Sequence, residues 1–103
     1  MILLLRHDDG ALVLFESLQD VTRHLEAIDI ENGEYEFCDS SGQRFLGVVT
    51  RAVGTFRPGA FELRPEGPPD PANAIALLDR AVRLEENPWH RDVESLRRHL
   101  TCA

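Results

Sequence analysis

The sequence predicts a single α+β domain, residues 1–103, in which an antiparallel sheet of about five strands packs against helices. The composition is the first observation: 43% of the residues are hydrophobic and 28% are charged, a balance typical of one globular domain. The second is that short apolar runs bounded by turn residues alternate with stretches of helical period. The expected order of elements along the chain is ββαβββαα.

The first two strands are expected at Ile2–Leu5 and Leu12–Phe15, because both runs are short and continuously apolar. Asp9 and Gly10 lie between them and predict a type I′ hairpin turn, since both residues tolerate positive φ. Apolar side chains on both faces of these strands indicate that helices, or a second subunit, cover the sheet on both sides. The chain is therefore expected to be a monomer or a homodimer.

A helix of about three turns is expected next. Ser17 can cap its first turn, and Asp20 stands where a negative charge favours the helix dipole. The helix should end before Asn32 and Gly33. Four apolar residues recur along one face and are expected to be buried: Leu18, Val21, Leu25 and Ile28.

Three further strands are expected in the middle of the chain. Tyr35–Asp39 and Gln43–Val53 flank a turn-rich connection at Asp39–Gly42. The pattern is interrupted at Arg57–Gly59, after which apolar and charged residues alternate over Phe61–Arg64 in what we predict to be the last strand.

Two helices are expected to complete the domain after a linker at Glu66–Pro69. Asp70 is a typical N-cap and Pro71 a typical first helical residue. The stripe expected to be buried on the first of these helices is Ala74, Ile75, Leu78, Ala81 and Val82. The last helix should follow the break at Asn87–Pro88 and close the core with Trp89, Val93, Leu96 and Leu100.

The residue types present exclude several chemistries. All 11 basic residues are arginine, so the chain has no lysine to bind nucleotide phosphates or to form a Schiff base. Cys38 and Cys102 lack the paired spacing of a zinc site and are expected to be reduced thiols. His7 precedes Asp8 and Asp9, a group that could hold a cation but is more typical of a solvated turn. We therefore expect no catalytic residue, no metal ligand and no cofactor.

The charge distribution is the strongest functional observation. Between Asp8 and Asp39 there are ten acidic residues and one basic residue, Arg23. Between Ser40 and Arg64, by contrast, there are four arginines and one glutamate. Clustered carboxylates can steer a basic protein and bind its arginines. The residues predicted to bind such a partner are Glu26, Asp29, Glu31, Glu34, Glu36 and Asp39. Two alternatives stay open: a cluster that only confers solubility, and a small enzyme or ligand-binding domain with an unrecognised pocket.

Two other classes of partner are not expected. The strand arginines could bind nucleic acid with Phe45, Phe56 and Phe61 as stacking groups, but the net charge of −7 would repel phosphates. The apolar run at Met1–Leu5 is too short for a signal peptide or a membrane span, so a cytoplasmic protein is expected.

The segment Leu25–Glu36, followed by Asp39 and Gly42, resembles a segment of small bacterial proteins, some of which are similar to immunity proteins of polymorphic toxin systems. The resemblance covers about a fifth of the chain and includes no catalytic signature. It implies a cytosolic protein that binds and blocks a cognate toxin.

Overall fold

The computed structural model describes residues 1–52, 54 and 59–101, and these form a mixed α and β fold. Its strands are β1 (Ile2–Arg6), β2 (Ala11–Phe15), β3 (Tyr35–Asp39), β4 (Arg44–Arg51), β5 (Ala60–Glu66) and β6 (Arg83–Leu84). Its helices are α1 (Leu18–His24), α2 (Ala27–Glu31), α3 (Pro71–Arg80) and α4 (Val93–Thr101). The predicted α+β class is confirmed.

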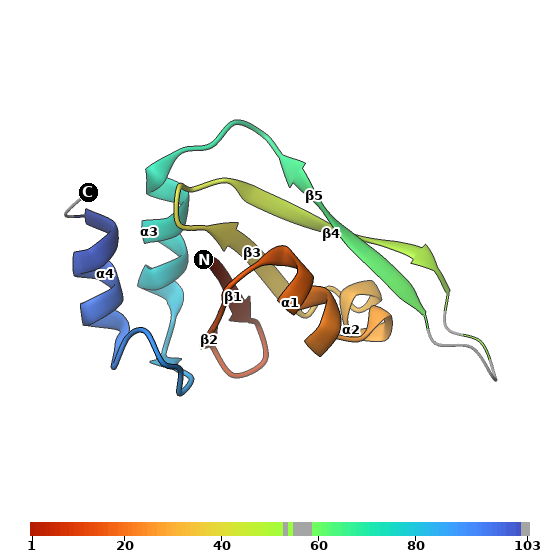
Figure 1. The fold of residues 1–103 in the computed structure, drawn as a ribbon, viewed down its shortest axis with the longest axis horizontal. Helices are drawn as coiled ribbons and strands as arrows, with labels where there is room; N and C mark the ends of the chain where they lie inside the picture. The colour runs from red at the N-terminus through yellow and green to blue at the C-terminus, as the bar shows by residue number, and fades with distance from the viewer. Residues whose placement is uncertain (53, 55–58, 102–103) are drawn as a thin grey trace.

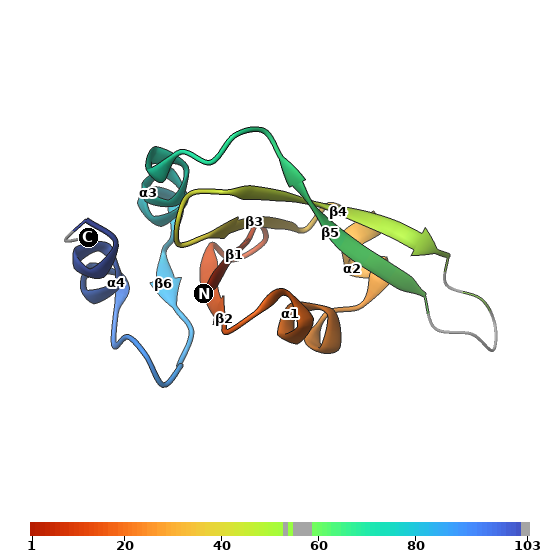
Figure 2. The ribbon, with the colours of Figure 1, turned by 45° about the horizontal axis from the view of Figure 1, so that its top comes forward.

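The sheet has six strands among the described residues, in the order β5-β4-β3-β1-β2-β6. The prediction of a purely antiparallel sheet is wrong, because β6 pairs in parallel with β2. Figure 2 shows β6 beside β2, in the segment that joins α3 to α4. This two-residue strand has no periodicity from which it could be predicted.

The N-terminal hairpin is confirmed, with Leu4 opposite Val13 in an antiparallel register. Its turn differs from the predicted type I′ turn, because Gly10 has a φ of 69° but no other described residue of the loop has a positive φ. The Asp9 carboxylate accepts the Ala11 N–H at 3.0 Å, and the Gly10 N–H donates to the Arg6 carbonyl at 3.0 Å. A four-residue loop therefore replaces the two-residue turn.

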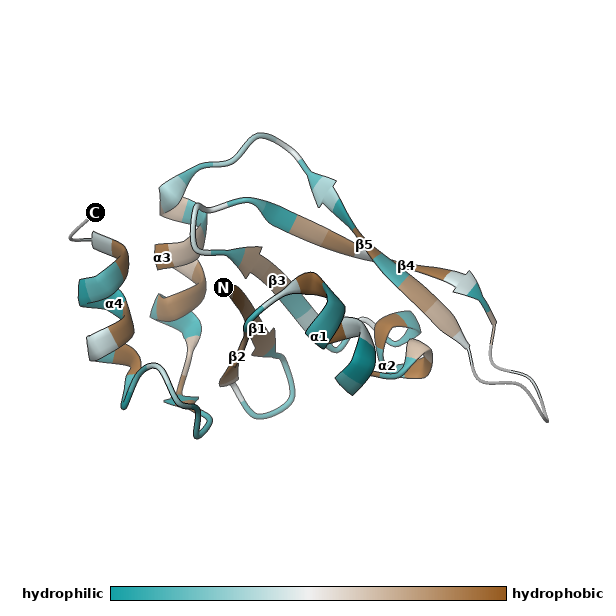
Figure 3. Cartoon of the chain, in the orientation of Figure 1, coloured by the Kyte–Doolittle hydropathy of each residue, from teal (hydrophilic) through white to brown (hydrophobic). Residues whose placement is uncertain are grey.

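Helices of the same chain cover both faces of β1, as its continuous apolarity predicts. Leu3 and Leu5 lie in a core cluster with residues of α3 and α4. Ile2 and Leu4 point the other way and pack with Val21 of α1. Figure 1 shows α3 and α4 side by side at one end of the molecule, and Figure 3 shows hydrophobic residues concentrated in β1 and β2. The sheet is the middle layer.

The single helix expected after Ser17 is instead two short helices. Ser17 caps α1 as predicted, its hydroxyl accepting the Asp20 N–H at 3.3 Å. The backbone becomes extended at Leu25, whose φ and ψ are −104° and 155°, and α2 begins two residues later. The break turns Leu25 into the core cluster but leaves Ile28 42% exposed, so the prediction that Ile28 is buried is wrong.

Strands β3, β4 and β5 lie where strands were predicted, and the long strands β4 and β5 pass over α2 and project beyond it (Figure 1). Phe45 and Phe61 are half-buried and pack against the edge of the cluster below α1 and α2. Four positions named in the predictions, Val53, Phe56, Arg57 and Cys102, lie outside the described residues.

The C-terminal third departs most from the predictions. Asp70 caps α3 as expected, accepting the Ala72 N–H at 3.0 Å. However, α3 ends at Arg80, and Val82 is 77% exposed rather than buried. Trp89 lies outside α4 and is 43% exposed, so the expectation that it closes the core is wrong. The core position belongs to Leu96, which is fully buried.

Candidate functional site

The structure brings four of the six predicted partner-binding residues together around α2. Glu26 precedes the helix, Asp29 and Glu31 are on it, and Glu34 follows it. We call Glu26, Asp29, Glu31 and Glu34 the α2 acidic patch. The other two, Glu36 and Asp39, lie along β3, where both side chains are engaged in contacts within the chain.

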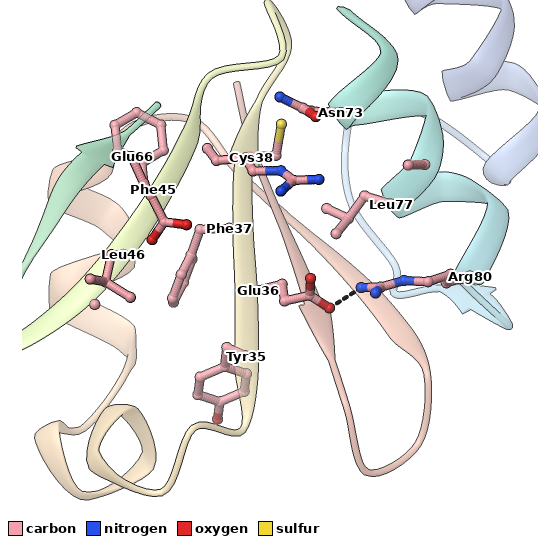
Figure 4. A pocket seen from close by; sticks show the side chains of 13 residues that line it. Tyr35, Glu36, Phe37, Cys38, Phe45, Leu46, Glu66, Asn73, Leu77 and Arg80 are labelled. Atoms are coloured by element: carbon pink, nitrogen blue, oxygen red, sulfur yellow. Dashed lines mark hydrogen bonds and ion pairs between the residues drawn. The ribbon is translucent and has the colours of Figure 1, made fainter. Parts of the chain in front are cut away.

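Glu36 lies on the sheet face that α3 covers. Its carboxylate forms an ion pair with Arg80 of α3, drawn as the dashed line in Figure 4. The ring of His7 approaches the same carboxylate, with Nε2 2.7 Å from Oε2. Glu36 therefore links β3 to α3 and to the first hairpin.

Asp39 stabilises the turn between β3 and β4. One carboxylate oxygen, Oδ1, accepts the Ser41 N–H at 2.9 Å, the Ser41 hydroxyl at 2.6 Å and the Gln43 N–H at 3.0 Å. These contacts are those of an Asx turn, a local structure that needs no partner.

The carboxylates of the α2 acidic patch have no such cationic neighbours. None of the four forms an ion pair within the described part of the chain. The pKa of Glu34 is raised, first because its carboxyl shares a hydrogen bond with that of Asp29, and then by partial burial and the charges of Asp29 and Asp8. Within the described residues, the patch is a concentration of negative charge without an ion-pair partner, and its carboxylates can accept hydrogen bonds from guanidinium groups.

Two other carboxylates, by contrast, are paired with arginines of the same chain. We call Arg6, Asp9, Arg83 and Glu85 the β6 ion-pair network, because these side chains connect the first hairpin to β6. Arg6 lies 2.9 Å from Asp9 and 2.5 Å from Glu85, and Arg83 lies 3.0 and 3.1 Å from the same two carboxylates. The pKa of Asp9 is lowered by the Ala11 N–H and by Arg6, and that of Glu85 by Arg83 and Arg6.

Sequence reasoning missed this network, because the two pairs that connect the hairpin to β6, Arg6–Glu85 and Asp9–Arg83, join residues more than 70 positions apart. The nine-residue spacing of His90 and His99 would place the two side chains on opposite sides of a single helix. In the structure His90 precedes α4, and the two rings have centroids 5.1 Å apart.

A groove of about 240 Å³ lies between α3 and the strands β3 and β4 (Figure 4). Leu46 and Leu77 contribute apolar surface to it, and Arg44 and Glu66 contribute opposite charges. Burial raises the pKa of the Cys38 thiol in this groove to about 11, so the thiol stays protonated at neutral pH. The groove can hold a small polar molecule, but its thiol is not activated as a nucleophile.

Among the described residues, no group of three histidine, cysteine or acidic side chains is placed to hold a metal ion. The ring nitrogens of His7 contact the Gly33 carbonyl oxygen, at 3.1 Å, and Glu36. Within residues 1–52, 54 and 59–101, no helix has the length and apolarity needed to cross a membrane.

Comparison with known proteins gives no match to a protein-family model, to a curated protein sequence or to a solved structure.

Proposed function

We propose that this chain is a non-catalytic protein-binding module that captures a basic protein through the α2 acidic patch. One observation carries the proposal: the carboxylates around α2 carry no cationic partner among the described residues, whereas those of the β6 ion-pair network are neutralised within the chain. Charge held close together without compensation is costly to the fold, which is a reason to connect it with binding.

The physical mechanism is electrostatic steering followed by direct contact. A concentrated negative surface raises the rate at which a positive partner encounters it, by about 10-fold to 1000-fold at low salt. On contact, Asp29 and Glu34 can take up forked hydrogen bonds from arginine. Arginine binding would also relieve the repulsion that raises the pKa of Glu34.

A cytoplasmic module of the immunity or regulatory type would act by covering the basic surface of its partner. This form of the proposal includes the resemblance of Leu25–Glu36 to immunity-like proteins, which implies a toxin as the partner. The segment contains Glu26, Asp29, Glu31 and Glu34, which are the whole of the α2 acidic patch.

The test compares two variants that each remove two negative charges. A partner is recovered by pull-down from the native organism and purified, and its association rate is measured at two salt concentrations. Glu31→Gln/Glu34→Gln should slow association by about threefold to tenfold at low salt. The control, Glu62→Gln/Glu94→Gln, changes exposed residues of β5 and α4 and should leave the rate near that of the wild type. Equal rates for the two variants would contradict the proposal.

A second candidate function is the binding of a small polar ligand in the groove of Figure 4. The observation that favours it is that the groove combines two opposite charges with an apolar wall. The charges are those of Arg44 and Glu66, which lie opposite each other on β4 and β5, and the wall includes Leu46. Ala76 is an exposed residue of α3 that lines this groove, so Ala76→Trp would fill it without changing the core. A ligand that raises the melting temperature of the wild type but not of Ala76→Trp would support this function.

A further inference from the structure

The exposed Trp89 belongs to a pocket away from both the α2 acidic patch and the groove of Figure 4. The pocket measures about 230 Å³ and lies between the start of α1 and the loop that precedes α4. Its lining includes three rings and three carboxylates: Phe15, His24, Trp89, Glu16, Asp20 and Glu86. Its volume is below the roughly 300 Å³ at which pockets for drug-sized ligands begin, so it is sized for a single side chain.

Contacts within the chain order the two segments that line this pocket. The Asn87 side-chain oxygen accepts hydrogen bonds from the backbone N–H groups of Trp89 and His90, at 2.9 and 2.8 Å. These bonds fix the backbone of the loop that carries the indole. On the opposite wall, the rings of Phe15 and His24 have centroids 5.8 Å apart. The loop backbone and the Phe15–His24 wall are therefore ordered by the chain itself, which reduces the entropy that their ordering would cost on binding.

The charge of the pocket determines the class of ligand that fits. Glu16 and Glu86 form no ion pair within the described part of the chain, and Asp20 has only a long contact of 3.7 Å to Arg23, whose side chain is 71% exposed. Aromatic faces attract cations through their quadrupoles, and carboxylates attract them directly. An aromatic pocket edged by carboxylates is thus complementary to an organic cation.

We propose that this pocket binds the guanidinium group of an arginine side chain presented by a protein partner. The planar guanidinium can stack on the indole of Trp89 while donating forked hydrogen bonds to Glu16 or Glu86, which the ammonium group of lysine cannot do. The identification of the occupant as part of a protein rests on the proposed function. The affinity of the pocket for a guanidinium group can be measured without any partner.

Trp89 is the only tryptophan of the chain, so intrinsic fluorescence reports directly on the pocket. The probe is N-acetyl-arginine amide, and its neutral analogue N-acetyl-citrulline amide has nearly the same shape. The arginine probe should give a saturable change in emission with a Kd on the order of 1–10 mM, as expected for one cation–π contact with charge-assisted hydrogen bonds. The citrulline analogue should give no saturable change. An equal response to both molecules, or none to either, would overturn the proposal.

A pair of charge-matched variants separates the pocket from the general negative charge of the molecule. Glu16→Gln/Glu86→Gln should weaken the arginine probe by about fivefold or more, because both carboxylates edge the pocket. Glu62→Gln/Glu94→Gln removes the same charge outside the pocket and should leave the Kd unchanged. Equal weakening by both would show that the pocket confers no selectivity. Far-UV circular dichroism checks that each variant folds.

This titration can fail independently of the proposed function. Loss of probe binding with an intact α2 effect on partner association would remove only the arginine pocket. The reverse result would leave the pocket as a guanidinium site and remove the α2 acidic patch as the steering surface.

Discussion

The two faces of the sheet are built differently. On one face, α3 and α4 have ten and nine residues and pack on a cluster that includes nine buried residues among those described. On the other, α1 and α2 have seven and five residues, and the corresponding cluster has four buried residues surrounded by half-buried side chains, several of them aromatic. The α3–α4 face is the better sealed of the two.

This difference indicates that the two faces have different roles, one in the stability of the fold and the other in binding. Helices as short as α1 and α2 are held by packing rather than by their own hydrogen bonds, so their layer depends on a few contacts with the sheet. The same layer carries the α2 acidic patch and one wall of the Trp89 pocket. We infer that the α3–α4 face supplies most of the stability and leaves the α1–α2 face available for binding.

The largest expected effect distinguishes a core residue from an exposed one in the C-terminal segment. Leu96 is fully buried against the α3–α4 face, so Leu96→Ala should lower the free energy of unfolding by about 2–5 kcal/mol. Trp89→Ala removes a larger side chain but should cost only about 1 kcal/mol, because the indole is partly in solvent. Urea unfolding followed by circular dichroism measures both.

The relative loss of unfolding free energy in Leu96→Ala and Trp89→Ala tests whether Trp89 belongs to the core. If Trp89→Ala destabilises the chain as much as Leu96→Ala, the indole is part of the core and the Trp89 pocket loses its basis.

The next effect concerns the contact that holds α2 on the sheet. A Cβ at Gly47 of β4 would lie 2.6 Å from Cγ2 of Ile30 in α2, closer than the two carbons can approach. Gly47→Ala should therefore displace α2 and cost about 1–3 kcal/mol, as overpacking usually does. Adding Ile30→Ala should recover part of that loss, because the clashing methyl group is gone. A double variant no more stable than Gly47→Ala would show that α2 does not pack through this contact.

Much of the fold could be predicted because its signals are local. Ser17 and Asp70 cap helices through side chains two or three residues from the N–H groups that they accept. The apolar runs of the first hairpin pair as expected, since a strand needs only its own period and a short connection to be recognised. Strand β3 could also be recognised locally, because Gly33 lies shortly before it and a turn follows it.

The rest depends on contacts that the sequence does not display. The apolar period continues through Leu25 without a local signal for the break there, or for the exposure of Ile28. The candidate sites show the same limit: Glu31 and Glu36 belong to one acidic run, yet among the residues that the structure describes only Glu36 forms an ion pair with an arginine, Arg80 of α3. Periodicity and charge counts cannot distinguish a paired carboxylate from an unpaired one.

The smallest expected effect tests that distinction through pH. The pKa of Glu34 is raised above its ordinary value of 4.5, so the folded state carries a repulsion at neutral pH that protonation removes. The pKa of Asp9 is lowered below its ordinary value of 3.8, so its charge supports the folded state above that pH, and this support is lost as the pH falls through the lowered value. The two carboxylates should therefore respond to amidation with opposite signs.

Glu34→Gln should raise the melting temperature at pH 7, and the gain should disappear as the pH is lowered through the raised pKa of Glu34 toward and below 4.5. Asp9→Asn should lower the melting temperature at pH 7, and this loss should shrink as the pH falls below 3.8. Both shifts should be smaller than that of Gly47→Ala, because the groups are exposed and screened by solvent and salt.

The asparagine can still accept the Ala11 N–H, so the second variant isolates the charge of Asp9 from its hydrogen bond. Melting curves of both variants and the wild type between pH 3 and about 7 measure the effect, with salt added in a second series to screen it. Shifts of the same sign at pH 7 would mean that the α2 acidic patch is already neutralised within the fold, and the α1–α2 face would then have no excess charge to attract a basic partner.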